Sequence, residues 1–155
     1  FIQVSPSGNI SNGKIFIDLP GKLRLDYIQP SNLLITSKGF WLVIQDRKLK
    51  STNNIPIQQT PFSILLDKNI NFNNKKIILD LKKSLGIITL KVKLAENTQA
   101  GELILEFSDN PFILKKWIIK DIIGDETTVF IQNSKLGHKL PFILFFPEDF
   151  PEPNN

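Results

Sequence analysis

The stretch GKIFIDLPGKLRLDYIQP, residues 13–30, is predicted to form two strands joined by a tight turn, and it decides the fold class. Apolar residues take every second position on both sides of the turn, which is typical of an antiparallel pair with one dry and one wet face. Pro20-Gly21 makes the turn, because proline restricts φ at the second turn position and glycine accepts a positive φ at the third. The residues expected on the dry face are Ile15, Ile17, Leu19, Leu23, Leu25 and Tyr27.

Further strands are predicted on both sides of this pair. Several stretches have the length and composition of strands. Residues 46–59, by contrast, are polar and are expected to form no regular structure. With the central pair, the strand-like stretches make about nine strands, at the spacing of an all-β domain. The additional strands are expected at residues 31–37, 40–45, 76–81, 87–94, 102–107, 112–120 and 127–132, and residues 1–4 are expected to be a short extended piece.

Only one helix is predicted, immediately after the polar stretch. Thr60 is expected at its N-cap and Pro61 at its first helical position, followed by the apolar run Phe62 to Leu66. Near the end of the chain, residues 142–147 read as a last strand or as a docked apolar segment.

This element order predicts a mainly β chain of 155 residues in a single domain, residues 1–155. Helices do not alternate with strands, so a parallel sheet is not expected. A sandwich, a closed barrel and one strongly curved antiparallel sheet remain possible. With so few elements to cover a wide sheet, an apolar concave face must meet a lid or a ligand.

Composition narrows the function further. The net charge is +4, and the lysine pairs are dispersed rather than grouped with aromatic residues, so they indicate solvated faces and no nucleic-acid site. There is no cysteine, which excludes disulfides and thiolate chemistry, and no apolar run of about 18 residues, so no transmembrane helix is predicted. The chain begins at Phe1 rather than Met, which predicts an upstream piece such as a cleaved signal peptide, a tag or disordered residues.

Residues suited to catalysis or metal binding are few. His138 is the only histidine and is expected in an exposed turn. Asp109 and Asp121 lie in turn sequences where a carboxylate commonly accepts backbone hydrogen bonds. No phosphate-binding glycine loop or nucleophile elbow is present. We therefore expect no catalytic residue, no metal, no cofactor and no enzyme.

Aromatic residues are abundant on or beside the predicted strands. The chain holds twelve Phe and two Trp but no Met. Two interpretations stay open, an ordinary packed core and a cavity for acyl chains. The large apolar residues that fall on or beside predicted strands are Leu23, Leu25, Tyr27, Phe40, Trp41, Phe107, Phe112, Trp117 and Phe130.

Short motifs follow one another in a fixed order along nearly the whole chain. Each is weak alone, but the ordered set is more specific. They are Phe1-Ile-Gln3; the glycine, PG and arginine pattern of residues 13–27; Pro30, the apolar residues 33–35, Gly39 and Asp46; Thr60-Pro61 with Leu65-Leu66; residues 101–107 with Pro111 and Trp117; and Asp121, Gly124 and Thr127 or Thr128.

This ordered set resembles the family of the periplasmic outer-membrane lipoprotein carrier LolA, in its alphaproteobacterial-type branch. The resemblance implies an incomplete antiparallel β-barrel with a short helical lid, and a family N-terminal helix upstream of Phe1. It implies a monomeric periplasmic chaperone that takes acylated lipoproteins from an inner-membrane LolCDE-type ABC transporter to a LolB-type outer-membrane receptor. A LolB-like receptor and a LolA-like sensing or binding module are the alternatives.

The resemblance also implies where the acyl chains would lie. It places them against the dry face of the central strands, under the lid. The cavity residues are Ile15, Ile17, Leu19, Leu23, Leu25, Tyr27, Trp41, Phe107 and Trp117, and the lid residues are Pro61, Phe62, Leu65 and Leu66.

One position departs from the family pattern. In the better-known branch an arginine precedes the turn proline and latches the lid, whereas this chain has Leu19. Arg24 follows the turn, but strand parity puts it on the face opposite Leu23 and Leu25. The lid is therefore expected to be held by apolar contacts or to be looser.

Overall fold

The computed structural model describes residues 1–69, 78–93 and 101–150 of the chain. These residues form one sheet of eleven antiparallel strands in the order β6-β5-β4-β3-β2-β1-β11-β10-β9-β8-β7. The strands are β1 Ile2–Val4, β2 Ile10–Asp18, β3 Lys22–Tyr27, β4 Leu33–Lys38, β5 Trp41–Asp46, β6 Ser51–Pro56, β7 Ile78–Ser84, β8 Ile87–Lys93, β9 Glu102–Ser108, β10 Ile113–Lys120 and β11 Glu126–Phe130.

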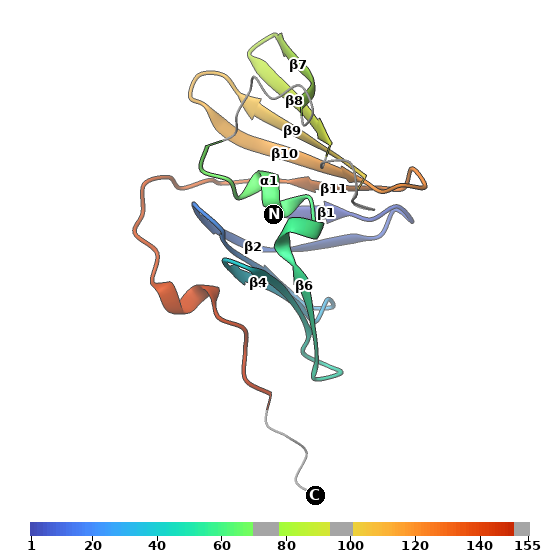
Figure 1. The fold of residues 1–155 in the computed structure, drawn as a ribbon, viewed down its shortest axis with the longest axis vertical. Helices are drawn as coiled ribbons and strands as arrows, with labels where there is room; N and C mark the ends of the chain where they lie inside the picture. The colour runs from blue at the N-terminus through green and yellow to red at the C-terminus, as the bar shows by residue number, and fades with distance from the viewer. Residues whose placement is uncertain (70–77, 94–100, 151–155) are drawn as a thin grey trace, which may run out of the picture.

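The sheet bends so strongly that its two halves face each other, yet its end strands β6 and β7 stay apart (Figure 1). This confirms the predicted mainly β fold and its arrangement as a curved sheet, an incomplete β-barrel. The short strand β1 joins the halves, because it pairs with β2 on one side and with β11 on the other. Strands β2 to β6 form one half and β7 to β11 the other.

The central hairpin forms as its alternation predicts. Ile15 is paired with Leu25, and Ile17 with Leu23, so the apolar residues of β2 and β3 share one face. Gly21 has φ +73°, the positive φ expected of the glycine in the turn.

Two expectations about the strands are wrong. The described residues contain eleven strands rather than about nine, because the extended piece at residues 1–4 contributes β1 and residues 51–56 of the polar stretch, expected to be irregular, form β6. Ser51-Thr-Asn-Asn lacks apolar alternation and only Thr52 favours a strand, and β6 forms because it can pair with β5 at the end of the sheet. Strand β7 begins at Ile78 and continues to Ser84, and the first two residues of the strand expected at 76–81 lie outside the described residues.

The predicted helix is present at the expected position, but Thr60 is not its N-cap. Helix α1 covers Phe62–Leu65 and follows a 3₁₀ turn, η1, at Ile57–Gln59. Thr60 does not cap α1, because its hydroxyl donates to the carbonyl of Ile57 at 2.8 Å. No helix in the described part of the chain is long and apolar enough to cross a membrane.

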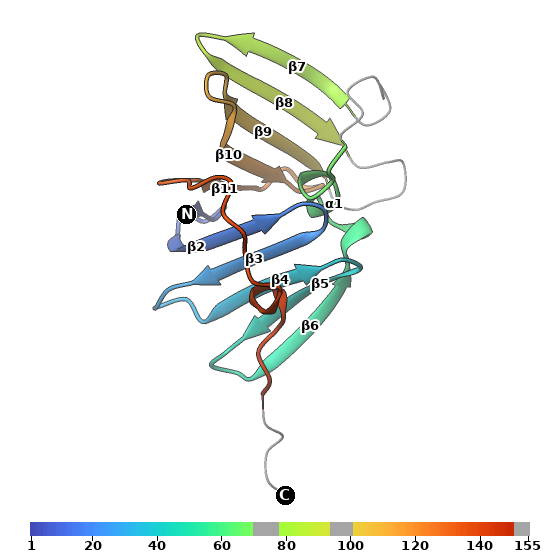
Figure 2. The same ribbon diagram turned by 90° about the vertical axis from the view of Figure 1, so that its left-hand side faces the viewer.

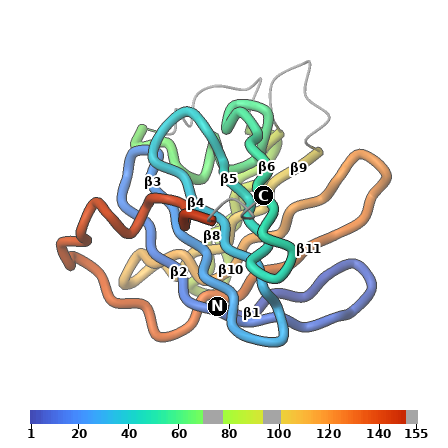
Figure 3. Tube along the Cα trace, turned by 90° about the horizontal axis from the view of Figure 1, so that it is seen from below, coloured from blue at the N-terminus to red at the C-terminus, as the bar shows by residue number. Residues whose placement is uncertain are grey.

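The C-terminal segment docks on the outside of the sheet and adds no strand. Its 3₁₀ turn η2, Phe142–Phe145, lies against β3 and β4 on the face away from α1 (Figures 2 and 3). Phe145 is fully buried there. Of the two alternatives for residues 142–147, the docked apolar segment is the one observed.

Candidate functional site

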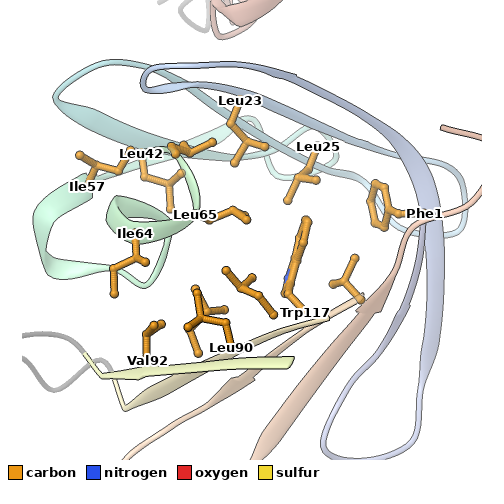
Figure 4. Packing of buried hydrophobic residues seen from close by; sticks show 14 of the residues in the cluster. Phe1, Leu23, Leu25, Leu42, Ile57, Ile64, Leu65, Leu90, Val92 and Trp117 are labelled. Carbon is orange, nitrogen blue, oxygen red and sulfur yellow. The ribbon is translucent and has the colours of Figure 1, made fainter. Parts of the chain in front are cut away.

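Both halves of the sheet turn apolar side chains into one interior (Figure 4). Leu23 and Leu25 enter it from β3, and Leu90 enters from β8 on the opposite half. Trp117 of β10 is 1% exposed and is flanked in the register by Leu105 and Val129, which share its face. The concave face of the sheet is therefore predominantly apolar across both halves.

Helix α1 occupies the space between the halves. Ile64, Leu65 and Leu66 are buried in the same cluster as the sheet residues. The ring of Phe62 meets that of Trp117 edge to face, with centroids 6.2 Å apart. The side chains of α1 are thus the present occupants of the interior.

The segment that carries α1 is attached to the sheet at both of its ends. We call residues 57–66, which span η1 and α1, the lid segment. The amide of Gly21 donates to the carbonyl of Leu66 at 3.0 Å, and the amide of Ile57 donates to the carbonyl of Phe40 at 2.9 Å. Gly21 lies in the β2–β3 turn and Phe40 in the β4–β5 turn. Between these attachments the lid segment presents apolar side chains to the interior.

One polar pair projects into the interior near β1. The Tyr27 hydroxyl donates to Oε1 of Gln3 at 2.7 Å. Burial raises the pKa of Tyr27 to about 12, although the hydrogen bond to Gln3 works in the opposite direction. The phenol therefore stays neutral at physiological pH, so the pair brings no charge to the apolar surface.

The structure brings together seven of the nine residues proposed for the cavity. Leu23, Leu25, Tyr27 and Trp117 belong to the buried cluster, while Ile15, Ile17 and Phe107 are partly buried against it. Of the lid residues, Leu65 and Leu66 belong to the cluster, Phe62 packs against it, and Pro61, which directly precedes α1, is partly buried.

Leu19 and Trp41 lie outside this cluster and are exposed. Leu19 has left the strand and belongs to the turn, so its alternation with Ile17 no longer directs it inward. In β5 it is Leu42 that pairs with inward-facing Ser37, which places Trp41 on the other face of the sheet. A shift of one residue is enough to reverse a side chain, and the apolar run of residues 40–44 does not indicate the correct phase.

Several interior residues were not named from the sequence. In β8 and β9 the alternation of Leu90 with Val92 and of Leu103 with Leu105 was a signal that could have found them. Ile57 and Ile64 carried no such signal, because they lie in single helical turns whose orientation depends on the sheet beneath.

The outer face carries the charged groups of the first half. Arg47 donates to Asp26 at 2.8 Å and to both carboxylate oxygens of Glu148, at 2.7 and 2.9 Å. Arg24 donates to Asp26 and to the carbonyl of Leu144. Arg24 therefore holds the C-terminal segment on the face away from the lid segment.

These contacts shift pKa values in opposite directions. Burial alone would raise the pKa of Asp26, but hydrogen bonds from Arg47 and Arg24 outweigh it and lower that pKa. The pKa of Glu148 is lowered chiefly by its hydrogen bonds from Arg47, against the effect of burial. The same bonds raise the pKa of Arg47. All three groups are thus charged at neutral pH.

The residues considered for catalysis lie apart from one another. His138 is exposed, as expected of a turn residue. Asp121 accepts hydrogen bonds from the amides of Ile123 and Asp125, which confirms its local role, whereas Asp109 pairs with Lys83 at 2.6 Å. Within the described ranges, no group of three or more His, Cys, Asp or Glu residues could hold a metal ion.

The fold is that of an open half-barrel: over the described residues the antiparallel sheet does not close, and one short helix covers its apolar concave face. The chain belongs to the LolA family, because the family model described as outer membrane lipoprotein carrier protein LolA matches residues 1–147. No relative among the curated proteins matches the chain. Members of this family are periplasmic carriers and not enzymes; they bind lipoproteins and interact with LolCDE and LolB.

Proposed function

We propose that this protein is a periplasmic chaperone that shields the acyl chains of lipoproteins in its concave interior and carries them from the inner to the outer membrane. It acts as a monomer, receiving lipoproteins from a LolCDE-type transporter and delivering them to a LolB-type receptor. The family match and the predominantly apolar concave face of both sheet halves support this proposal.

The observation that carries the proposal is the occupancy of the interior by the side chains of α1. Ile64, Leu65 and Leu66 have the same aliphatic character as an acyl chain and are joined to the sheet mainly through apolar contact. An acyl chain that enters would replace them, so one apolar occupant is exchanged for another. Residues such as Leu23, Leu25 and Trp117 would form the wall in both states.

The energies of this exchange suit a carrier. Burying an aliphatic side chain is worth about 1.5–3 kcal/mol, and a sixteen-carbon acyl chain about 12 kcal/mol, if each becomes fully buried. Displacing Ile64, Leu65 and Leu66 costs about 4.5–9 kcal/mol once, which offsets a substantial part of the gain from the first acyl chain that enters. A ligand held against such a cost is bound firmly enough to cross an aqueous space and can still be released.

The proposal is tested by a reporter on the lid segment. The natural chain has no cysteine, so Phe62→Cys gives a single labelling site for a bimane dye. The Phe62 ring lies 6.2 Å from that of Trp117, and tryptophan quenches bimane at contact. A synthetic triacylated lipopeptide should displace α1, separate the dye from Trp117 and raise bimane emission severalfold.

Two controls give this result its meaning. The same peptide without acyl chains should leave the emission unchanged, and in a Trp117→Phe background the emission should be high from the start. Dye that stays quenched at saturating lipopeptide would show that the interior does not exchange its occupant, and the carrier proposal would fail.

A further inference from the structure

Exposed aromatic side chains gather at the end of the sheet where the β2–β3 and β4–β5 turns lie. Phe40 is 64% exposed and Trp41 46% exposed, and their rings meet edge to face at 5.0 Å. Phe142 and Ile143 of η2 are also largely exposed, as is Leu19 beside the first turn. We call this group, with Lys22 and Lys38, the turn patch.

The members of the turn patch are drawn together by contacts from three separate segments. A Cβ placed on Gly21 would lie 3.5 Å from the Cα of Gly39, so the two turns are neighbours. The ammonium group of Lys38 lies 3.5 Å from the ring centroid of Phe146, and that of Lys22 lies 5.9 Å from the ring centroid of Phe142. The two lysines are themselves cross-strand partners in β3 and β4.

The patch does not resemble an ordinary solvated face. Single exposed apolar residues are common, but a group of exposed apolar residues that includes the Phe40–Trp41 pair, with Phe142 packed on Phe146 beside it, is typical of a surface that meets a membrane or a partner. Tryptophan, phenylalanine and lysine together are the side chains that favour the boundary between water and lipid. The aromatic rings would insert below the headgroups, and the aliphatic stems of the lysines would carry their ammonium groups toward the headgroups.

Charge at the patch is positive but small. Asp18 forms an ion pair with Lys22 and offsets it. Among the described residues no carboxylate pairs with Lys38, whose ammonium group stays over the Phe146 ring. The protein as a whole carries a net charge of +4. The balance therefore favours an anionic surface, with most of the attraction supplied by the aromatic rings.

We propose that the turn patch docks this protein on the surface of a phospholipid bilayer, with a preference for anionic headgroups. This goes beyond lipoprotein carriage and does not depend on it, since no patch member belongs to the interior cluster. The patch is also the place where the lid segment is attached, through Gly21 and Phe40. Docking consequently brings both attachment points of the lid segment close to the bilayer surface.

The test is flotation of the intact protein with vesicles. Protein is mixed at low salt with vesicles of POPC alone or of POPC and POPG at about 7:3, and the bound fraction is measured. Wild type should bind the POPG vesicles more tightly than POPC alone. The variant Phe40→Ser/Trp41→Ser should lose about tenfold in partition coefficient, and Lys38→Glu should weaken binding to POPG vesicles selectively.

A matched control lies in the turn between β10 and β11. Ile122 and Ile123 are 67% and 78% exposed, so Ile122→Ser/Ile123→Ser removes a similar amount of exposed apolar surface elsewhere. This control should bind as wild type does. Equal loss in the control, or no binding of wild type to either vesicle, would overturn membrane docking and leave the patch as a surface for a protein partner.

Depth of insertion gives an independent readout. In a Trp117→Phe background, Trp41 is the remaining tryptophan. Brominated lipids in the vesicle should quench its emission if the patch enters the interface. Emission unaffected by bromine in protein that floats with the vesicles would show that another surface binds, and would also overturn the proposal.

Discussion

Gly13 shows how a single position on β2 is set by contact with another strand. Its Cα faces the carbonyl of Asp26 so closely that an added Cβ would lie 2.2 Å from that oxygen. The same Cβ would lie 2.8 Å from Cε1 of Phe1. Backbone and an aromatic ring thus leave no room for any side chain at this position.

We therefore predict that Gly13→Ala lowers the free energy of unfolding by about 1–3 kcal/mol, because β2 and β3 must separate to admit the methyl group. Urea denaturation followed by circular dichroism measures the change. Lys14→Ala, at the exposed neighbouring position, is the control and should cost less than about 0.5 kcal/mol. An unchanged midpoint for Gly13→Ala would mean that the two strands approach less closely than the structure shows.

At the scale of single residues, the sequence predicts side-chain orientation only in part. Alternation was enough to direct Leu23 and Leu25 inward, because polar residues separate them. It could not assign a face to Trp41, since its neighbours are also apolar. Gly13 stood out as a motif position, but the reason for it lies in the distance between two strands, which no local pattern contains.

Among the elements, the C-terminal segment depends most on charge. Glu148 is held at its backbone by the side-chain amide of Gln45, which both donates to its carbonyl and accepts from its amide. Its carboxylate binds Arg47. Because these contacts span about a hundred residues of sequence, they fasten the end of the chain to the first half of the sheet.

This arrangement predicts a pH dependence. The folded-state pKa of Glu148 is lowered, so the folded protein binds a proton at that group less readily than the unfolded chain does. Its contribution to stability is complete above the unfolded pKa, about 4.3, and is lost as the pH falls through the lower folded value. Asp26 acts in the same direction.

We expect Glu148→Gln to lower the free energy of unfolding by up to about 1 kcal/mol at pH 7, since the carboxylate is partly exposed. The difference from wild type should shrink as the pH is lowered below about 4. Urea titrations at several pH values measure it, with Glu126→Gln, an exposed partner of Lys120, as the control. A difference that stays constant from pH 7 to pH 3 would contradict the role given to this carboxylate.

Most strands could be predicted from the sequence, but the strands or segments with which each one pairs could not. The strand patterns of β3, β8 and β9 were read correctly because alternation and strand-forming residues coincide there. Strand β6 was missed because its polar residues pair only under the influence of β5. The docking of η2 depends on Arg24 and on the outer face of β3 and β4, which are distant in sequence.

For the whole molecule, the strands alone left a sandwich, a closed barrel and a curved sheet possible. The choice rests on β1, which pairs Val4 with Ile10 locally and with Thr128 from the far end of the sheet. That second pairing joins the two halves into one continuous surface. A contact across more than a hundred residues is invisible to any local pattern, so here the family resemblance supplied what periodicity could not.

The shared interior predicts that the two halves unfold together. Trp41 in β5 and Trp117 in β10 provide one fluorescent probe in each half. In each of the single-tryptophan proteins Trp117→Phe and Trp41→Phe, the urea transition followed by fluorescence should coincide with that followed by circular dichroism. A fluorescence transition that precedes the other in either protein would indicate two separately folding units instead of one domain.

The gap between β6 and β7 has a consequence for capacity. A closed barrel has a circumference set by its strand number and stagger, and it can widen only by breaking a strand pair. In the described part of the chain, β6 and β7 each pair with one neighbour, so the arc can flex outward while its ten inter-strand ladders stay intact. Under the proposed carrier function, an interior bounded by such an arc is expected to accept acyl groups of different bulk.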